Sequence, residues 1–123
     1  MPGHTVTVTR DQITRYAAAS DDDNPIHLDE AAALAAGLPG VIAHGMLSMG
    51  ILGSVATEWA GGADRVRKVV CRFASVVRPD DVLTYTGIVS AVDDSRVEVN
   101  VSVVNQRDEP VLTRAVVVFD APR

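Results

Sequence analysis

The sequence predicts an α+β domain in which an antiparallel sheet curves around one long apolar helix. Two observations lead to this prediction. Residues 45–59 are apolar on nearly every side, so we expect a helix that other elements enclose. From Arg67 onward the hydrophobic pattern changes to alternation along the chain, which is typical of strands. A chain of 123 residues is long enough for one continuous core, so a single domain over residues 1–123 is expected.

The N-terminal segment predicts a strand followed by a helix. Residues 4–9 alternate and are rich in β-branched side chains, which suits a short strand. Thr9, followed by Gln12, has the pattern of a capping box, in which a side-chain oxygen satisfies an N–H group at the start of a helix. We therefore expect a helix from this cap through about Ala19.

Proline and glycine punctuate the region that follows. Residues 20–25 are polar and acidic, and Pro25 disfavours the helical conformation of the residue before it, so a loop is expected. A short helix is predicted from Leu28 to Ala36, and the segment Gly-Leu-Pro-Gly at residues 37–40 ends it.

The long apolar helix is predicted from about Gly45 to Trp59, and it ends before residues 61–62, which are both glycine. Gly50 and Gly53 lie inside it, where a glycine costs about 1 kcal/mol relative to alanine. We expect the close approach of another backbone to compensate for this cost.

The second half predicts four consecutive strands. The turns between them are too short to hold crossover helices, so the strands are expected to be mainly antiparallel. The predicted strands cover residues 69–77, 82–92, 97–103 and 111–119.

Composition and charge exclude several classes of function. Eleven Lys and Arg against sixteen Asp and Glu give a net charge of −5, the wrong sign for binding nucleic acid. The N-terminus has no basic region followed by an apolar run, so no secretory signal is expected. The longest apolar stretch, residues 46–60, is interrupted by polar residues and is shorter than the ~20 residues that span a bilayer. We expect a cytoplasmic protein with neither a nucleic acid nor a membrane as partner.

A polar cluster lies at residues 20–27, Ser-Asp-Asp-Asp-Asn-Pro-Ile-His. A calcium loop is excluded because its alternating ligand pattern would place Pro25 at a ligand position. A transition-metal site would rest on one histidine, and the single cysteine, Cys71, has apolar neighbours that favour a small buried side chain. The structural alternative is an acidic run that caps the next helix and stays solvated, with His27 packed at the end of the loop.

A second distinctive segment lies at residues 40–50, Gly-Val-Ile-Ala-His-Gly-Met-Leu-Ser-Met-Gly. A phosphate-binding loop is excluded because Ile51 stands where that loop needs lysine. A nucleophile elbow is excluded because Gly45 precedes Ser48 by three residues rather than two. What remains is a helix N-terminus, whose free N–H groups and positive dipole end can hold a developing oxyanion.

Together the two segments resemble the MaoC-like hydratase/dehydratase family of hot-dog-fold proteins. The residues that carry the resemblance are Asp-x-Asn-Pro-Ile-His at 22–27 and Ala-His-Gly-Met at 43–46, two separated motifs in the expected order. The resemblance covers most of the chain. It implies a single hot-dog domain, in which a sheet wraps around a long central helix. Such domains commonly pair, so a homodimer is expected, and a heterodimer stays open.

The resemblance also implies an activity. The family hydrates trans-2-enoyl thioesters, or dehydrates (R)-3-hydroxyacyl thioesters, on coenzyme A or an acyl carrier protein, without a cofactor or a metal. The aspartate and histidine of the first motif are catalytic in the family, which carries over to Asp22 and His27. The backbone N–H that polarises the thioester carbonyl carries over to Gly45.

The chemistry of hydration explains these residue types. Water loses a proton as it attacks C3, and C2 gains one, so two groups that hold the same water can do both. Pro25 stiffens the turn between Asp22 and His27, and Asn24 can hydrogen-bond locally to fix it. His44 either orients the start of the helix or contacts substrate.

Ser48 leaves the same alternatives open as His44, helix packing or contact with substrate. The sequence departs from the family pattern at Asp21, which stands where the family has glycine and adds a charge beside Asp22, so the working pH stays open. Two other functions stay open: a non-catalytic hot-dog subunit of a heterodimeric dehydratase, which would need neither Asp22 nor His27, and an acyl-thioesterase, which would release a free thiol.

Overall fold

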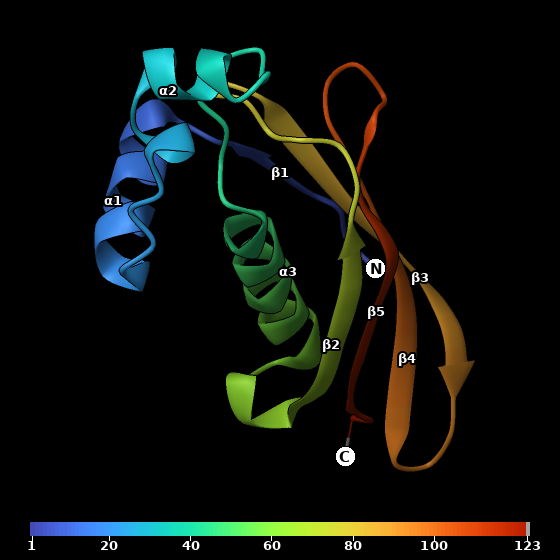
Figure 1. Ribbon diagram of the computed structural model, residues 1–123. Coiled ribbons are helices and arrows are strands. Elements are labelled where there is room, and N and C mark those ends of the chain that lie inside the picture. Colours follow the sequence, from blue (N-terminus) through green and yellow to red (C-terminus); the bar gives the residue numbers. More distant parts are fainter. Residues whose placement is uncertain (123) are drawn as a thin grey trace.

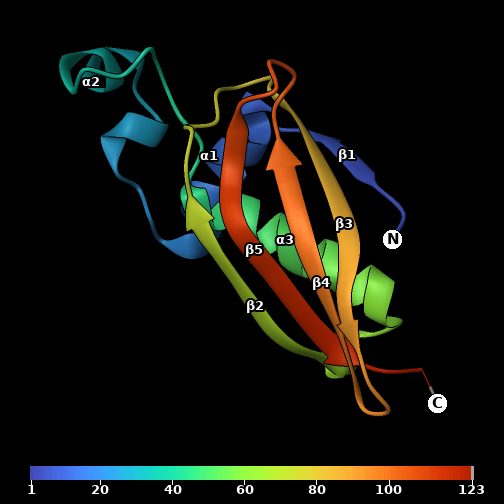
Figure 2. The same cartoon turned by 90° about the vertical axis from the view of Figure 1, so that its right-hand side faces the viewer.

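One antiparallel sheet wraps around the helix α3 (Gly45–Ala60) in the computed structural model, which describes residues 1–122 (Figure 1). The strands lie in the order β1-β3-β4-β5-β2, and each neighbouring pair is antiparallel. In Figure 2 the sheet stands in front of α3 and α1, and α2 lies outside the sheet at the upper left. The strands are β1 His4–Thr7, β2 Val66–Phe73, β3 Val82–Val92, β4 Arg96–Val104 and β5 Pro110–Asp120. The predicted fold class is confirmed.

The strand β2 lies at an edge of the sheet, away from its sequence neighbour β3. It pairs with β5, for example Val69 with Val117. Residues 74–81 carry the chain from this edge to the other half of the sheet, where β3 begins. One side of β2 is therefore free of any partner strand in the described residues 1–122.

The predicted strand over residues 69–77 is wrong at both ends. β2 begins three residues earlier, at Val66, and ends at Phe73. The N–H groups of Ala74 and Ser75 still donate to carbonyls of β5, those of Val111 and Pro110, and only after them does the chain turn away from β5. The carbonyl of Val77 accepts a hydrogen bond of 2.7 Å from the N–H of Ala43, in the segment that leads into α3.

The helix α1 (Arg10–Ser20) begins as its capping pattern predicts. Thr9 Oγ1 accepts a hydrogen bond of 3.1 Å from the N–H of Gln12. The C-cap residue Asp21 follows the helix, and its φ of 61° lies in the left-handed region. This conformation costs most residues about 1 kcal/mol relative to glycine, and it is the position at which the family pattern has glycine.

The helix α2 (Glu30–Ala35) is shorter than the predicted helix over residues 28–36. Its N-cap is Asp29, whose carboxylate accepts hydrogen bonds from two N–H groups of the first turn. The predicted start is two residues early, because Leu28 lies between this cap and the short 3₁₀ turn η1 (Pro25–His27).

The helix α3 is only half enclosed, which corrects the expectation of full enclosure. One face, which includes Leu52 and Ala56, is buried, whereas Met46 is 54% exposed on the other face. A Cβ added at Gly50 or Gly53 would meet no atom within 4 Å, so the expected close approach of a backbone is absent from residues 1–122. The physical reason is that a single sheet covers one side of a helix. No helix in the described part of the chain is long and apolar enough to cross a membrane.

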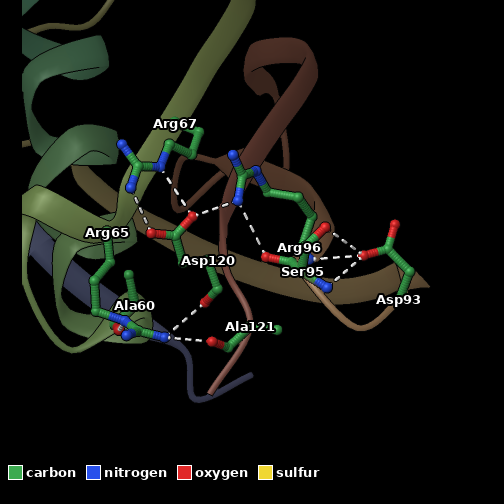
Figure 3. Close-up of polar contacts among 8 residues, drawn as sticks. All are labelled: Ala60, Arg65, Arg67, Asp93, Ser95, Arg96, Asp120 and Ala121. Atoms are coloured by element: carbon green, nitrogen blue, oxygen red, sulfur yellow. Dashed lines mark hydrogen bonds and ion pairs between the residues drawn. The ribbon is translucent and has the colours of Figure 1, made fainter. Parts of the chain in front are cut away.

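The C-terminal end of α3 is tied to the sheet by arginines (Figure 3). Arg65 Nε donates to the carbonyl of Ala60 at 2.8 Å, and its Nη2 donates to the carbonyls of Asp120 and Ala121 at 2.9 and 2.7 Å. The carboxylate of Asp120 pairs with Arg67 and with Arg96. The hydrogen bond from Arg67 holds the pKa of Asp120 below its usual range.

Cys71 lies on β2 and is half-buried, packed against the core. Burial raises the pKa of its thiol. The prediction of a small buried side chain is thus met in part.

Candidate active site

A pocket of about 350 Å³ lies at the N-terminal end of α3, next to the edge strand β2. Its walls come from the segment that leads into α3 and its first turn, from the end of β2 and the residues after it, and from β5. The side of the pocket formed by the 20–27 loop contributes two polar residues, Asp22 and His27. The other lining residues are Ile42, Ala43, His44, Gly45, Met46, Ser48, Phe73, Ala74, Ser75, Val76, Val77, Val111 and Leu112.

Local hydrogen bonds shape the loop that carries Asp22. Asn24 Oδ1 accepts a hydrogen bond of 3.2 Å from the N–H of Ile26, which caps η1. A carboxylate oxygen of Asp22 accepts a long hydrogen bond, 3.4 Å, from the N–H of Asn24. Pro25 opens the 3₁₀ turn and turns the chain back, so that His27 is buried while Asp22 stays exposed. Asn24 is exposed and outside the pocket lining, so its place in the structure is that of a turn-forming residue.

The loop and the start of α3 bring three ionisable side chains together. A carboxylate oxygen of Asp22 and one ring nitrogen each of His27 and His44 all lie within 4.8 Å of one another. The convergence of Asp22 and His27 that the Pro25 turn was expected to produce is therefore present. His44 is the third member, and only 3% of it is exposed.

The hydrogen bonds of the two histidines assign their tautomers. His27 Nδ1 lies 2.7 Å from the carbonyl oxygen of Ile42, and a carbonyl can only accept, so Nδ1 carries the hydrogen. The lone pair of neutral His27 is then on Nε2. In His44 it is Nε2 that donates, to the carbonyl of Asp22 at 2.9 Å. The rings of His27 and His44 are stacked, with centroids 3.7 Å apart and planes 22° apart.

The backbone at Gly45 provides the free donor that the helix N-terminus was expected to provide. The helix α3 begins at Gly45, and no oxygen within residues 1–122 accepts a hydrogen bond from its N–H. The ring of Phe73 packs against this residue, because a Cβ added at Gly45 would lie 3.0 Å from a ring carbon. A larger residue at this position would have to displace the Phe73 ring by a few tenths of an ångström.

The three side chains are a poor fit for a metal ion. The planes of the stacked His27 and His44 rings are only 22° apart, so their in-plane lone pairs lie in two nearly parallel planes. The ligands of one metal ion must instead all point at that ion. A proton-transfer site agrees better with this arrangement than a metal centre.

Ser48 is buried in the first turns of α3 and lines the pocket, so the structure is compatible with both interpretations of this residue. Its carbonyl accepts a hydrogen bond of 2.9 Å from the hydroxyl of Tyr85 on β3, which anchors the helix to the sheet. Burial raises the pKa of Tyr85, so its hydroxyl keeps the proton that it donates.

Sequence reasoning missed the walls of the pocket. Phe73, Val76 and Leu112 line it, whereas the sequence predicts them only as strand residues. Their place depends on the pairing of β2 with β5, which alternation along the chain does not predict. Tyr16 packs against the core, and its ring also packs on that of His44, with centroids 4.8 Å apart.

Comparison with known proteins agrees with this geometry. The family model described as MaoC like domain matches residues 2–110. The chain belongs to the MaoC-like family. Both sequence motifs lie within the matched region, so the resemblance stated from these residues is confirmed.

Relatives of this MaoC-like domain are named as dehydratases and fatty acid synthase subunits. It is 42% identical, over 76 residues, to 3-hydroxyacyl-thioester dehydratase X of Mycobacterium tuberculosis; the match covers 62% of this chain and 26% of that protein. It is 40% identical, over 70 residues, to fatty acid synthase subunit beta of Saccharomyces cerevisiae; this match covers 55% of the chain and 3% of that subunit. The domain thus spans a small part of the length of these curated relatives.

Solved structures of similar fold include an (R)-hydratase. R-Hydratase PhaJ1 from Pseudomonas aeruginosa is 29% identical with a TM-score of 0.80, over 99% of this chain and 80% of that chain. The ChsH1-ChsH2 complex from Mycobacterium tuberculosis has a TM-score of 0.88 at 24% identity, over 99% of this chain and 94% of that chain, and shows the shared fold. Relatives named hydratase or dehydratase are hydro-lyases, in agreement with the predicted enzyme class.

Proposed function

We propose that this MaoC-like domain catalyses the reversible hydration of trans-2-enoyl thioesters to (R)-3-hydroxyacyl thioesters. The observation that carries the proposal is the convergence of the Asp22 carboxylate and the His27 imidazole in one pocket with the free N–H of Gly45. The names of the relatives support the same class of reaction.

Proton transfer in the proposed reaction uses a water held between Asp22 and His27. The lone pair on His27 Nε2 accepts a proton as the water oxygen forms a bond to C3, and the Asp22 carboxylate accepts a hydrogen bond from the other hydrogen. The electron pair of the C2–C3 double bond moves onto the thioester oxygen. Return of the proton to C2 completes the addition, so the protein is unchanged at the end of a cycle.

The charge that develops on the thioester oxygen is the second requirement. The N–H of Gly45 is free, and it lies at the positive end of a helix of 16 residues. Loss of one such donor in an oxyanion site typically costs about 3 kcal/mol. Gly45 is therefore proposed as the oxyanion donor.

The proposed substrate class follows from the lining of the pocket. Apart from the polar residues at one side, the walls are mostly aliphatic, with Val76, Val111 and Leu112 among them, which suits an acyl chain. The carrier is proposed to be coenzyme A or an acyl carrier protein, because the reaction needs a thioester. Ser48 is proposed to contact this substrate from the floor of the pocket.

A second copy of the chain is the proposed partner at the edge strand β2. This edge is unpaired in the described residues, and it exposes the apolar side chains Val70, Phe73 and Val76 beside the pocket. Pairing there would cover these side chains and complete the pocket wall. We expect Val70→Lys to convert a dimer to a monomer, whereas Ile88→Lys, at a 76% exposed site on β3, leaves the dimer intact. Sedimentation equilibrium measures both, and a dimer unaffected by Val70→Lys would contradict the proposed interface.

The experiment that tests the function is an assay with a short trans-2-enoyl-CoA. We expect loss of the enoyl absorbance, formation of the (R)-3-hydroxy product on chiral analysis, and no loss with Asp22→Asn. Release of free thiol would instead indicate a thioesterase. A folded wild-type chain that is inactive on both CoA and carrier-protein substrates would indicate a non-catalytic subunit.

A further inference from the structure

His44 connects the two residues that hold the proposed catalytic water. Its Nε2 donates to the main-chain oxygen of Asp22 at 2.9 Å, and its ring stacks on that of His27 at 3.7 Å between centroids. Tyr16 packs against the same ring. Because His44 is only 3% exposed, these contacts rather than solvent determine its orientation.

The surroundings of His44 favour one tautomer. The carbonyl of Asp22 can only accept, so Nε2 must carry a hydrogen. Nδ1 is buried and has no hydrogen-bond partner in the described residues. A hydrogen on Nδ1 would be a buried donor without an acceptor, which is unfavourable. The neutral ring with its hydrogen on Nε2 is the form that fits.

We propose that His44 is a positioning residue, which in this neutral form holds the Asp22 loop and the His27 ring in one relative geometry. This inference rests on the proposed function, since the geometry it preserves is that of hydration.

The Asp22 loop needs such a restraint. Asp22 is exposed, and its N–H makes only a local hydrogen bond, to Ser20 Oγ at 3.3 Å. Within residues 1–122, the bond from His44 is the one hydrogen bond that joins residues 21–23 to any residue after Asn24. Without it the carboxylate would be carried by a loop that no distant element holds.

The His27 ring needs a neutral neighbour. When His27 accepts a proton from water it becomes an imidazolium, stacked on His44 at 3.7 Å. A neutral aromatic ring presents its π face to this cation, which is attractive, whereas a protonated His44 would repel it. Three titratable side chains lie near His44: the Asp22 carboxylate, the His27 ring and the Tyr16 phenol.

Two substitutions of similar size separate positioning from packing. His44→Gln places an amide N–H near the position of Nε2 and can restore the bond to Asp22, whereas His44→Asn places its amide near Nδ1 and cannot. We expect His44→Asn to lower kcat about 100-fold with little change in KM, and His44→Gln to recover most of that loss. His4→Asn is the control, because His4 contacts Glu58 and Trp59 at the other end of α3, and its kcat should be unchanged. Equal losses in the Gln and Asn variants, or a change in KM alone, would overturn the proposal.

A measurement on the wild-type chain keeps the proposal testable if a variant fails to fold. Nitrogen-15 NMR of labelled histidine reports which ring nitrogen of His44 carries hydrogen. We expect hydrogen on Nε2 alone at pH values where the chain is active, and hydrogen on Nδ1 would overturn the inference. A chain that hydrates no enoyl thioester overturns the proposed function, whereas an active chain with the other tautomer overturns only the role of His44, so the two failures are distinguishable.

Discussion

The two ends of α3 differ in how their polar groups are satisfied. At the C-terminal end, the N–H groups of Gly61 and Gly62 both donate to the carbonyl of Thr57 at 3.0 Å, and Arg65 donates to the carbonyl of Ala60. At the N-terminal end, the cap residue His44 makes no side-chain capping hydrogen bond. There the N–H of Gly45 and the Nδ1 of His44 have no partner in residues 1–122.

This difference separates an end that stabilises the fold from an end built to bind. Helix termini leave several backbone groups to be satisfied, and native proteins normally satisfy them. The C-terminal end follows that rule with two glycines and an arginine. The N-terminal end leaves donors and acceptors free beside an apolar pocket, which is the arrangement that a polar reacting group requires. Substitutions at the N-terminal end should therefore lower activity, and substitutions at the C-terminal end should lower stability.

The largest effect is expected at the N-terminal end. His27→Asn retains a donor near the position of Nδ1, for the carbonyl of Ile42, and removes the Nε2 that accepts the proton. We expect the hydration rate to fall about a thousandfold, with a loss of about 1 kcal/mol in the free energy of unfolding. Steady-state kinetics and urea denaturation measure the two quantities. A variant that keeps a tenth or more of the activity would exclude His27 as the base.

Removal of Arg65 should give the opposite result. Arg65→Met deletes hydrogen bonds to three backbone carbonyls at the C-terminal end, so we expect a loss of about 3 kcal/mol of stability. The hydration rate of the folded variant should be unchanged, because Arg65 lies at the far end of α3 from the pocket. A stable but inactive Arg65→Met chain would remove the distinction between the two ends.

Asp81 gives a prediction on pH dependence. Its side chain is 4% exposed, and burial alone would raise its pKa, yet hydrogen bonds from the Arg78 N–H, Gln106 and Arg107 lower it. Because the folded pKa lies below the unfolded one, the stabilisation is present above about pH 4 and is lost as the pH falls through the folded pKa. We expect Asp81→Asn to lower stability at pH 7 by about 2 kcal/mol and to weaken the acid dependence of unfolding. Parallel pH titrations of stability for the two chains test this, and identical acid dependence would contradict it.

The smallest effect is expected at the exposed middle of α3. A Cβ at Gly50 would meet no atom within 4 Å, so Gly50→Ala should raise the free energy of unfolding by about 1 kcal/mol without altering activity. Gly87→Ala is the matched control, because its Cβ would lie 2.7 Å from Trp59 and from Val99 and should destabilise the chain. Thermal unfolding ranks the two variants. Destabilisation by Gly50→Ala would contradict the prediction.

Local signals in the sequence predicted the elements well, and the spatial arrangement of those elements less well. The capping pattern at Thr9, the glycines after α3 and the alternation of β3 act within a few residues, so these boundaries could be predicted. The placement of β2 beside β5 depends on pairing between distant segments, which alternation cannot specify. The enclosure of α3 also depends on distant segments, and the expected full enclosure was wrong because the one sheet covers only one side of the helix.

The candidate site shows the same division. The Pro25 turn predicted that Asp22 and His27 would approach each other, since its effect is local. The stacking of His44 on His27 joins residues 17 positions apart, and the wall residue Phe73 comes from the far edge of the sheet. Neither contact has a signal in the residues around it.

The most direct test of the hydration site follows the oxygen of water. We would incubate the wild-type chain with a short trans-2-enoyl-CoA in ¹⁸O-labelled water and locate the label by mass spectrometry. We expect one labelled oxygen in the hydroxyl at C3, and labelling about a thousandfold slower with His27→Asn than with the wild type. Label in a carboxylate, released together with free coenzyme A, would contradict it, because the water would then have attacked the thioester carbonyl rather than C3.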